Sequence, residues 1–145
     1  GSEMCIRDRD NMLVEKAREK WDKKHDLNCA ECIMYAANEE YNLNLSKETL
    51  KVMSSFGGGL AIGNVCGAAT GAAGVLGLMF TEDRGHQSPQ TRALTQEFME
   101  KFYDKLGYYN CTDLKAKYKK DDDRRCIVMI ETAAEVLDEI VRRER

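Results

Sequence analysis

Residues 65–77 read Val-Cys-Gly-Ala-Ala-Thr-Gly-Ala-Ala-Gly-Val-Leu-Gly, and this stretch decides the fold. A glycine inside a helix costs roughly 1 kcal/mol relative to alanine, so a stretch with four glycines does not become helical by propensity alone. It becomes helical only where neighbouring elements pack closely against its bare backbone. The stretch therefore predicts a central Gly/Ala-rich helix that ends near Phe80 and carries Cys66 in its first turn.

Length and charge limit what the chain can be. Its 145 residues suffice for one domain with a sizeable core. The net charge is −3 with both signs mixed, which gives no electrostatic basis for binding nucleic acid. The densest charged run, Lys115 to Arg125, contains cations on both sides of three aspartates, and it predicts a solvated turn whose charges cancel.

The first residues do not read as part of the domain. Gly1-Ser2 is typical of a protease-cleavage scar, and residues 3–9 resemble a translated sequencing adaptor. We therefore expect residues 1–9, with Cys5, to be a non-native or disordered leader, and residues 10–145 to form a single helical domain. No signal peptide with an apolar core is present, which favours the cytoplasm.

The uncharged stretch of residues 60–80 is long enough to span a membrane. Its Gly/Ala content makes it only modestly hydrophobic, and no aromatic belt or asymmetry of basic residues flanks it. A central helix of a globular bundle explains the stretch better, so we expect no membrane span.

Apolar residues elsewhere recur at the spacing of helices. The pattern predicts helices over about 10–24, 28–42, 46–56, 89–107, 110–118 and 124–143, with N-caps at Asn28, Ser46 and Ser88. Pro89 fits the first helical position, and Gly107 fits the end of the same helix. No alternating β-branched run occurs. We expect an all-α fold, a compact bundle of five or six helices around the Gly/Ala helix.

Four cysteines share a position that their number alone does not reveal. Cys29, Cys66, Cys111 and Cys126 each fall in the first turn of a predicted helix, where unpaired N–H groups and the helix dipole favour negative charge. If the four helix starts converge, their thiolates suit a shared redox site or a metal cluster. We expect Cys66 to be the most acidic thiol. Cys32, one helical turn beyond Cys29, is a further candidate ligand or resolving thiol.

Known cysteine and glycine motifs fit poorly. Cys29 and Cys32 form a single Cys-x-x-Cys without a second pair, which argues against zinc fingers, and no βαβ context supports a thioredoxin-like motif. The Gly-rich loop before the central helix lacks the pattern of a phosphate-binding loop. Its glycines and those of the helix could instead let a cofactor approach the backbone, or serve close helix packing alone. The candidate positions are Gly58, Gly59, Gly63, Gly67 and Gly71.

The order of these elements resembles a known family. Cys66-Gly67-Ala68-Ala69-Thr70-Gly71 matches a C-G-A-x-x-G signature that lies between one earlier and two later cysteines. The chain thus resembles, over about residues 17–141, a family of small redox-active proteins named for this cysteine pattern, C_GCAxxG_C_C. Cys29, Cys111 and Cys126 match the other three cysteines, Gly57-Gly58-Gly59 resembles the family's glycine run, and Cys32 is additional. The resemblance implies a helical redox protein with an iron–sulfur cluster or reactive thiols, often acting beside oxidoreductases or transporters.

Two functions remain open at this point. In the first, Cys29, Cys66, Cys111 and Cys126 hold an iron–sulfur cluster that passes electrons to or from a partner oxidoreductase or electron carrier, because thiolate-only ligation suits such clusters. In the second, no cofactor is bound, and Cys29, Cys32 and Cys66 carry out thiol–disulfide exchange. The Gly-rich helix face is also typical of chains that form homodimers.

Overall fold

The structure, a computed structural model, describes residues 12–145, and the expected leader with Cys5 lies outside this range. Within it, regular structure is helical apart from one isolated β-bridge between Val65 and Asn110. Residues 12–20 are helical. The named helices are α2 (Cys29–Glu40), α3 (Lys47–Lys51), α4 (Gly67–Phe80), α5 (Pro89–Leu106), α6 (Cys111–Tyr118) and α7 (Ile127–Glu144), and short helical turns cover Lys23–His25, Val52–Ser55, Gly59–Gly63 and Gly85–Gln87. The all-α prediction is confirmed.

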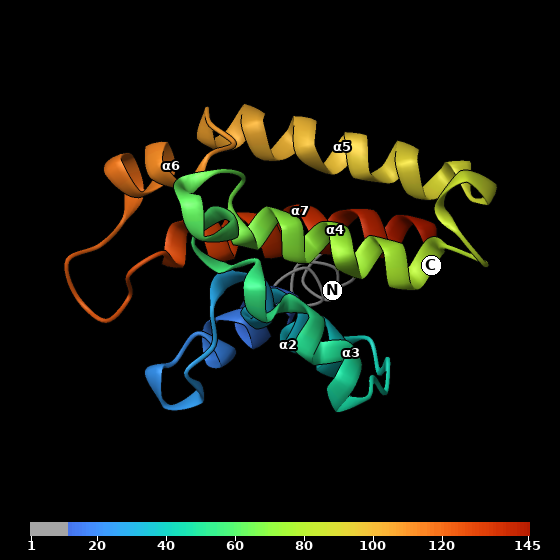
Figure 1. The fold of residues 1–145 in the computed structure, drawn as a ribbon, viewed down its shortest axis with the longest axis horizontal. Coiled ribbons are helices and arrows are strands. Elements are labelled where there is room, and N and C mark those ends of the chain that lie inside the picture. The colour runs from blue at the N-terminus through green and yellow to red at the C-terminus, as the bar shows by residue number, and fades with distance from the viewer. Residues whose placement is uncertain (1–11) are drawn as a thin grey trace, which may run out of the picture.

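Helix α4 lies at the centre of the bundle, as its bare backbone predicts. It packs against α2, α5 and α7, and Figure 1 shows it beside α7, with α5 above and α2 and α3 below. A Cβ placed on Gly71 would stand 2.7 Å from the carbonyl oxygen of Ala30 in α2. The two backbones therefore lie closer than any side chain at Gly71 would allow.

Local sequence signals fix the helix starts. The Asn28 side chain accepts a hydrogen bond from the Glu31 N–H, and the Glu31 carboxylate accepts one from the Asn28 N–H, which completes a capping box for α2. Pro89 opens α5, and Gly107 ends it with a φ of 84°. The helix expected over 46–56 is shorter, because α3 ends at Lys51 and the chain tightens into the turn Val52–Ser55.

The core fills the space between α4, α5 and α7. Phe98 and Phe102 of α5 are fully buried and stack with ring centroids 5.8 Å apart. Leu76 of α4 and Leu137 of α7 are equally buried. No helix within residues 12–145 is both long and apolar enough to cross a membrane, in agreement with the rejection of a span over 60–80.

Candidate redox site

The four cysteines stand where four helices begin. Cys29 and Cys111 are the first residues of α2 and α6, and Cys66 and Cys126 are the N-cap residues of α4 and α7. The placement predicted from sequence is confirmed. Each sulfur is therefore attached next to backbone N–H groups that have no partner within the helix.

The four helix starts also meet. A hydrogen bond between the Cys29 and Cys126 thiols is the largest cause of the pKa shift of each. The charges of Cys111 and Cys126 both act on the Cys66 thiol, and the charge of Cys66 acts on Cys29. We call Cys29 and Cys126 the outer pair and Cys66 and Cys111 the inner pair. Residues separated by up to 97 positions thus form one group of thiols.

A short backbone clamp holds the inner pair. The Cys66 N–H donates to the Tyr109 carbonyl at 2.8 Å, and the Cys111 N–H donates to the Asn64 carbonyl at 2.6 Å. These bonds flank the Val65–Asn110 bridge. They fix the start of α6 against the start of α4, although the two helices are joined only through α5.

The segment before α4 is a left-handed turn where the sequence predicts a plain loop. Gly58, Gly59, Leu60 and Ala61 have φ values of 63°, 62°, 61° and 66°. Such values are unfavourable for residues with a Cβ, so Leu60 and Ala61 keep them only because their surroundings impose them. The turn places the Gly59 backbone against Cys111, since a Cβ there would lie 2.7 Å from the Cys111 Cβ.

The five candidate glycines divide into two groups. Gly58 lines a pocket at the outer pair, Gly59 lies against Cys111, and a Cβ on Gly67 would lie 3.2 Å from the Cys29 Cβ. Gly63 and Gly71 do not border a thiol. Their missing side chains leave room for Thr112 of α6 and Ala30 of α2. At these two positions the space is used for packing within the chain.

The outer pair opens into a shallow depression of about 260 Å³. Its lining consists of Trp21, Leu27, Asn28, Cys29, Gly58, Lys115, Lys119, Arg125 and Cys126. The run from Lys115 to Arg125 is solvent-exposed at Lys115 and Lys119, as predicted, but its charges do more than cancel one another, because these two lysines and Arg125 border the outer pair. The available signal was that Cys126 follows this run directly.

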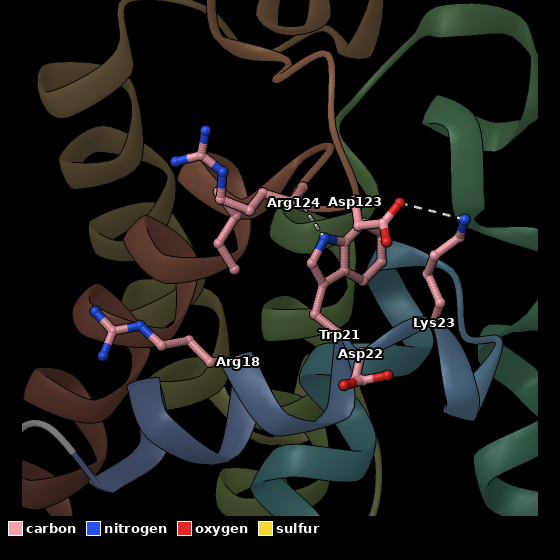
Figure 2. Close-up of a pocket in the computed structure, with 7 residues that line it drawn as sticks. Arg18, Trp21, Asp22, Lys23, Asp123 and Arg124 are labelled. Carbon is pink, nitrogen blue, oxygen red and sulfur yellow. Dashed lines mark hydrogen bonds and ion pairs between the residues drawn. The ribbon is translucent and has the colours of Figure 1, made fainter.

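Trp21 fixes the segment that leads into Cys126, a role that the sequence did not suggest. Its indole N–H donates to the Arg124 carbonyl at 2.8 Å, and its ring lies 4.1 Å from the Arg125 guanidinium. Arg125 donates in return to the Trp21 carbonyl at 2.7 Å. Figure 2 shows the indole facing Arg124, and next to it the Lys23–Asp123 ion pair at 3.3 Å. The chain before α2 and the chain before α7 are thereby joined.

The pKa values of the two thiols of the outer pair are shifted in opposite directions. The hydrogen bond from Cys29 lowers the pKa of Cys126 to about 6, against the effect of burial, and the charges of Lys115, Lys119 and Arg125 lower it further. The same hydrogen bond and burial raise the pKa of Cys29 well above its ordinary value. The neighbouring cations favour the thiolate form of Cys126, with Cys29 as the proton-bearing donor of this pair.

The prediction that Cys66 is the most acidic thiol is wrong. Cys66 is 3 % exposed, and burial raises its pKa to about 11. The N–H groups of Ala68 and Ala69 face the sulfur and act in the opposite direction, but neither closes a capping hydrogen bond, and desolvation outweighs them. A position at a helix N-terminus is not sufficient to ionise a buried thiol.

Cys32 lies one helical turn inside α2 rather than at a helix start, although its charge also acts on the Cys29 thiol. It is fully buried, burial raises its pKa to about 12, and its thiol donates to the Ala17 carbonyl at 3.2 Å. All five cysteines in the described part of the chain are free thiols. In the same part of the chain, no three Cys, His, Asp or Glu side chains are close enough together to hold a single metal ion.

One comparison with known proteins succeeds. The model of a family described as "Putative redox-active protein (C_GCAxxG_C_C)" matches residues 27–140, which is most of the chain and includes all four site cysteines. The pattern in that description writes its second element as Gly-Cys-Ala, whereas this chain has Cys66-Gly67-Ala68. No curated protein and no solved structure matches the chain.

Proposed function

The chain belongs to the C_GCAxxG_C_C family of redox-active proteins, and from that premise we propose that its four gathered cysteines form one site that carries an iron–sulfur cluster and exchanges electrons with a partner oxidoreductase. The observation that carries the proposal is that four thiols from four helix starts form one electrostatically linked group. We expect Cys29, Cys66, Cys111 and Cys126 to be the ligands.

The residues present fit such a cluster. Thiolates are its usual ligands, and its sulfur ligands bind different iron atoms, so they are spread more widely than the ligands of one ion. Four helix N-termini and the cations Lys115, Lys119 and Arg125 offset the negative charge that four thiolates bring. Gly59 and Gly67 keep side chains away from Cys111 and Cys29.

When bound, the cluster would supply a centre that takes up and releases single electrons. The protein's own residues supply the environment. Cys66, Cys111 and Cys126 are all buried, which keeps water away from most of the site. The outer pair borders the depression and gives the route by which an electron reaches a partner. The cations beside Cys126 favour its deprotonated form, which is the form that binds metal.

A second candidate is metal-free thiol–disulfide exchange, favoured by the hydrogen bond between Cys29 and Cys126. The Cys126 thiolate would attack one sulfur of a partner's disulfide and expel the other as a thiolate. Cys29, after losing its proton, would then attack Cys126 in the mixed disulfide and release the second thiolate. The partner gains two electrons and a Cys29–Cys126 disulfide forms. Here Cys126 replaces Cys32 and Cys66 of the sequence hypothesis, because both of those thiols are buried with raised pKa values.

Anaerobic purification followed by iron and sulfide analysis separates the two candidates. Brown protein with iron and sulfide in similar amounts, both lost in Cys29→Ser, supports the cluster. Colourless protein that forms a Cys29–Cys126 disulfide reversibly, mapped by mass spectrometry, supports exchange. Protein with neither property contradicts both. A reducing, cytoplasmic setting belongs to both candidates because thiols persist there, and a homodimer stays a prediction.

A further inference from the structure

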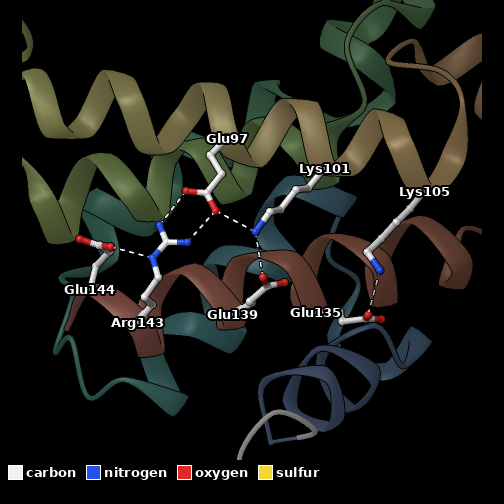
Figure 3. Close-up of polar contacts among 7 residues, drawn as sticks. All are labelled: Glu97, Lys101, Lys105, Glu135, Glu139, Arg143 and Glu144. Atoms are coloured by element: carbon white, nitrogen blue, oxygen red, sulfur yellow. Dashed lines mark hydrogen bonds and ion pairs between the residues drawn. The ribbon is translucent and has the colours of Figure 1, made fainter.

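On the face of the bundle formed by α5 and α7, several cations already have carboxylate partners. Along α5 and α7, Lys101 lies 2.8 Å from Glu139, Lys105 lies 3.2 Å from Glu135, and Arg143 lies 2.6 Å from Glu97. Figure 3 shows these side chains meeting across the two helices. These three positive charges are therefore offset by neighbouring carboxylates.

The edge beside the cysteines is different. Lys115 and Lys119 are exposed, and no carboxylate in residues 12–145 forms an ion pair with either. Arg125 stacks on Trp21 and donates to the Trp21 and Asp123 carbonyls, so its charge is not cancelled by a carboxylate in these contacts. Lys115, Lys119 and Arg125 thus lie beside the outer pair without an ion-pair partner among the described residues. Three aspartates line an adjoining depression with them, but Asp122 is paired with Arg124 and Asp123 with Lys23.

Exposed apolar side chains lie on the turn that follows Gly58, a residue that lines the same depression. Ile62 is 76 % exposed and Leu60 is 44 % exposed, on the left-handed turn that begins at Gly58 in the same depression. The turn packs against α6, and the Thr112 hydroxyl donates to the Gly63 carbonyl at 3.2 Å. Exposed apolar side chains with a polar rim are a common arrangement at protein contact surfaces.

We propose that this surface, formed by Leu60, Ile62, Lys115, Lys119 and Arg125, docks a redox partner protein whose contact face is rich in carboxylates around an apolar centre. The inference rests on the proposed function, since it describes the partner of the same site. Complementary charge speeds the encounter of the two proteins and orients them. Docking here brings a partner's redox centre over Cys29 and Cys126, the two thiols that border the depression.

The test uses an acidic plant-type ferredoxin as the probe protein and measures its affinity for the purified chain at low ionic strength. We expect Lys115→Glu with Lys119→Glu to lower the affinity at least tenfold, and we expect 0.5 M salt to remove the difference. The matched control is Lys47→Glu with Arg92→Glu, which changes the net charge equally at exposed positions on α3 and α5 and should change affinity less than twofold. Ile62→Ser should weaken binding by several-fold without lowering thermal stability.

Three outcomes overturn the docking surface. In the first, ferredoxin does not bind the unchanged protein at low salt. In the second, the two charge-reversed variants lose affinity equally. In the third, the chain self-associates and only Lys115→Glu with Lys119→Glu abolishes this, which would assign the surface to a second copy of the chain. A parallel titration with a small neutral mediator measures the redox change of the site itself. If that change is absent, the proposed function fails; if it is present while the probe ignores Lys115 and Lys119, only the docking surface fails.

Discussion

Cys66 and Cys126 hold the same place in two helices and have opposite acidities. Both are N-cap residues, at the starts of α4 and α7, but the pKa of Cys66 is raised to about 11 and that of Cys126 is lowered. Cys66 is buried and has other thiols as its charged neighbours, and both raise its pKa. Cys126 has a hydrogen-bond donor in Cys29 and three cations around a depression open to water. Neighbours and burial, rather than the helix dipole, decide which thiol ionises.

The largest effect should come from removing the sulfur of either Cys66 or Cys126. If both cysteines hold one cluster, Cys66→Ser and Cys126→Ser should each remove more than nine-tenths of the bound iron and of the redox activity. Cys32→Ser is the matched control, and because the buried Cys32 thiol donates to the Ala17 carbonyl, a bond that a serine hydroxyl can also make, we expect it to retain most of both. Full activity in Cys66→Ser with none in Cys126→Ser would restrict the chemistry to the outer pair.

The second-largest effect tests the close approach of α2 and α4, which brings the starts of these two helices together. In Gly71→Ala the new Cβ would stand 2.7 Å from the Ala30 carbonyl oxygen, so α2 and α4 must separate, and we expect a loss of about 1–3 kcal/mol in the free energy of unfolding. Gly77→Ala in the same helix meets no atom within 4 Å and should gain up to about 1 kcal/mol. Urea denaturation measures both. Equal stability of the two variants would contradict the close packing of α2 on α4.

Alkylation of metal-free protein sharpens the comparison directly. Only the thiolate reacts, so the rate at each cysteine rises with pH until the thiol is fully ionised. Because the pKa of Cys126 is lowered to about 6, its rate should level off above about pH 7. The Cys66 rate should still rise at pH 9, since burial raises its pKa to about 11. Site-resolved mass spectrometry after timed labelling gives both profiles, and identical profiles would refute the assignment.

The smallest effect separates the causes of Cys126 acidity. Lys115→Gln with Lys119→Gln removes two positive charges, which should move the plateau of Cys126 alkylation to higher pH. The shift should be smaller than in Cys29→Ala, because the hydrogen bond from Cys29 is the largest cause and the lysines are exposed and screened by salt. A larger shift in the lysine variant would reverse the order of the two causes. Lys47→Gln with Arg92→Gln controls for net charge.

Much of the fold follows from local signals. Asn28 with Glu31, Pro89 and Gly107 mark helix ends through hydrogen bonds and backbone angles formed within a few residues, so the sequence is sufficient to place them. The Gly/Ala composition of α4 likewise demands close neighbours and hence a central position. The left-handed turn at Gly58–Ala61 was not predictable, because Leu60 and Ala61 adopt it only under constraint from the packed chain.

The sequence by itself determined that four cysteines begin four helices, since capping and periodicity are properties of adjacent residues. Only the tertiary structure decided that Cys29 pairs with Cys126, that Cys66 is buried, and that Lys115 and Lys119 face thiols rather than solvent alone. The physical reason is that desolvation and charge act through space, over contacts between residues up to 97 positions apart along the chain. A helix start fixes where a thiol is attached, and the packing around it fixes what that thiol can do.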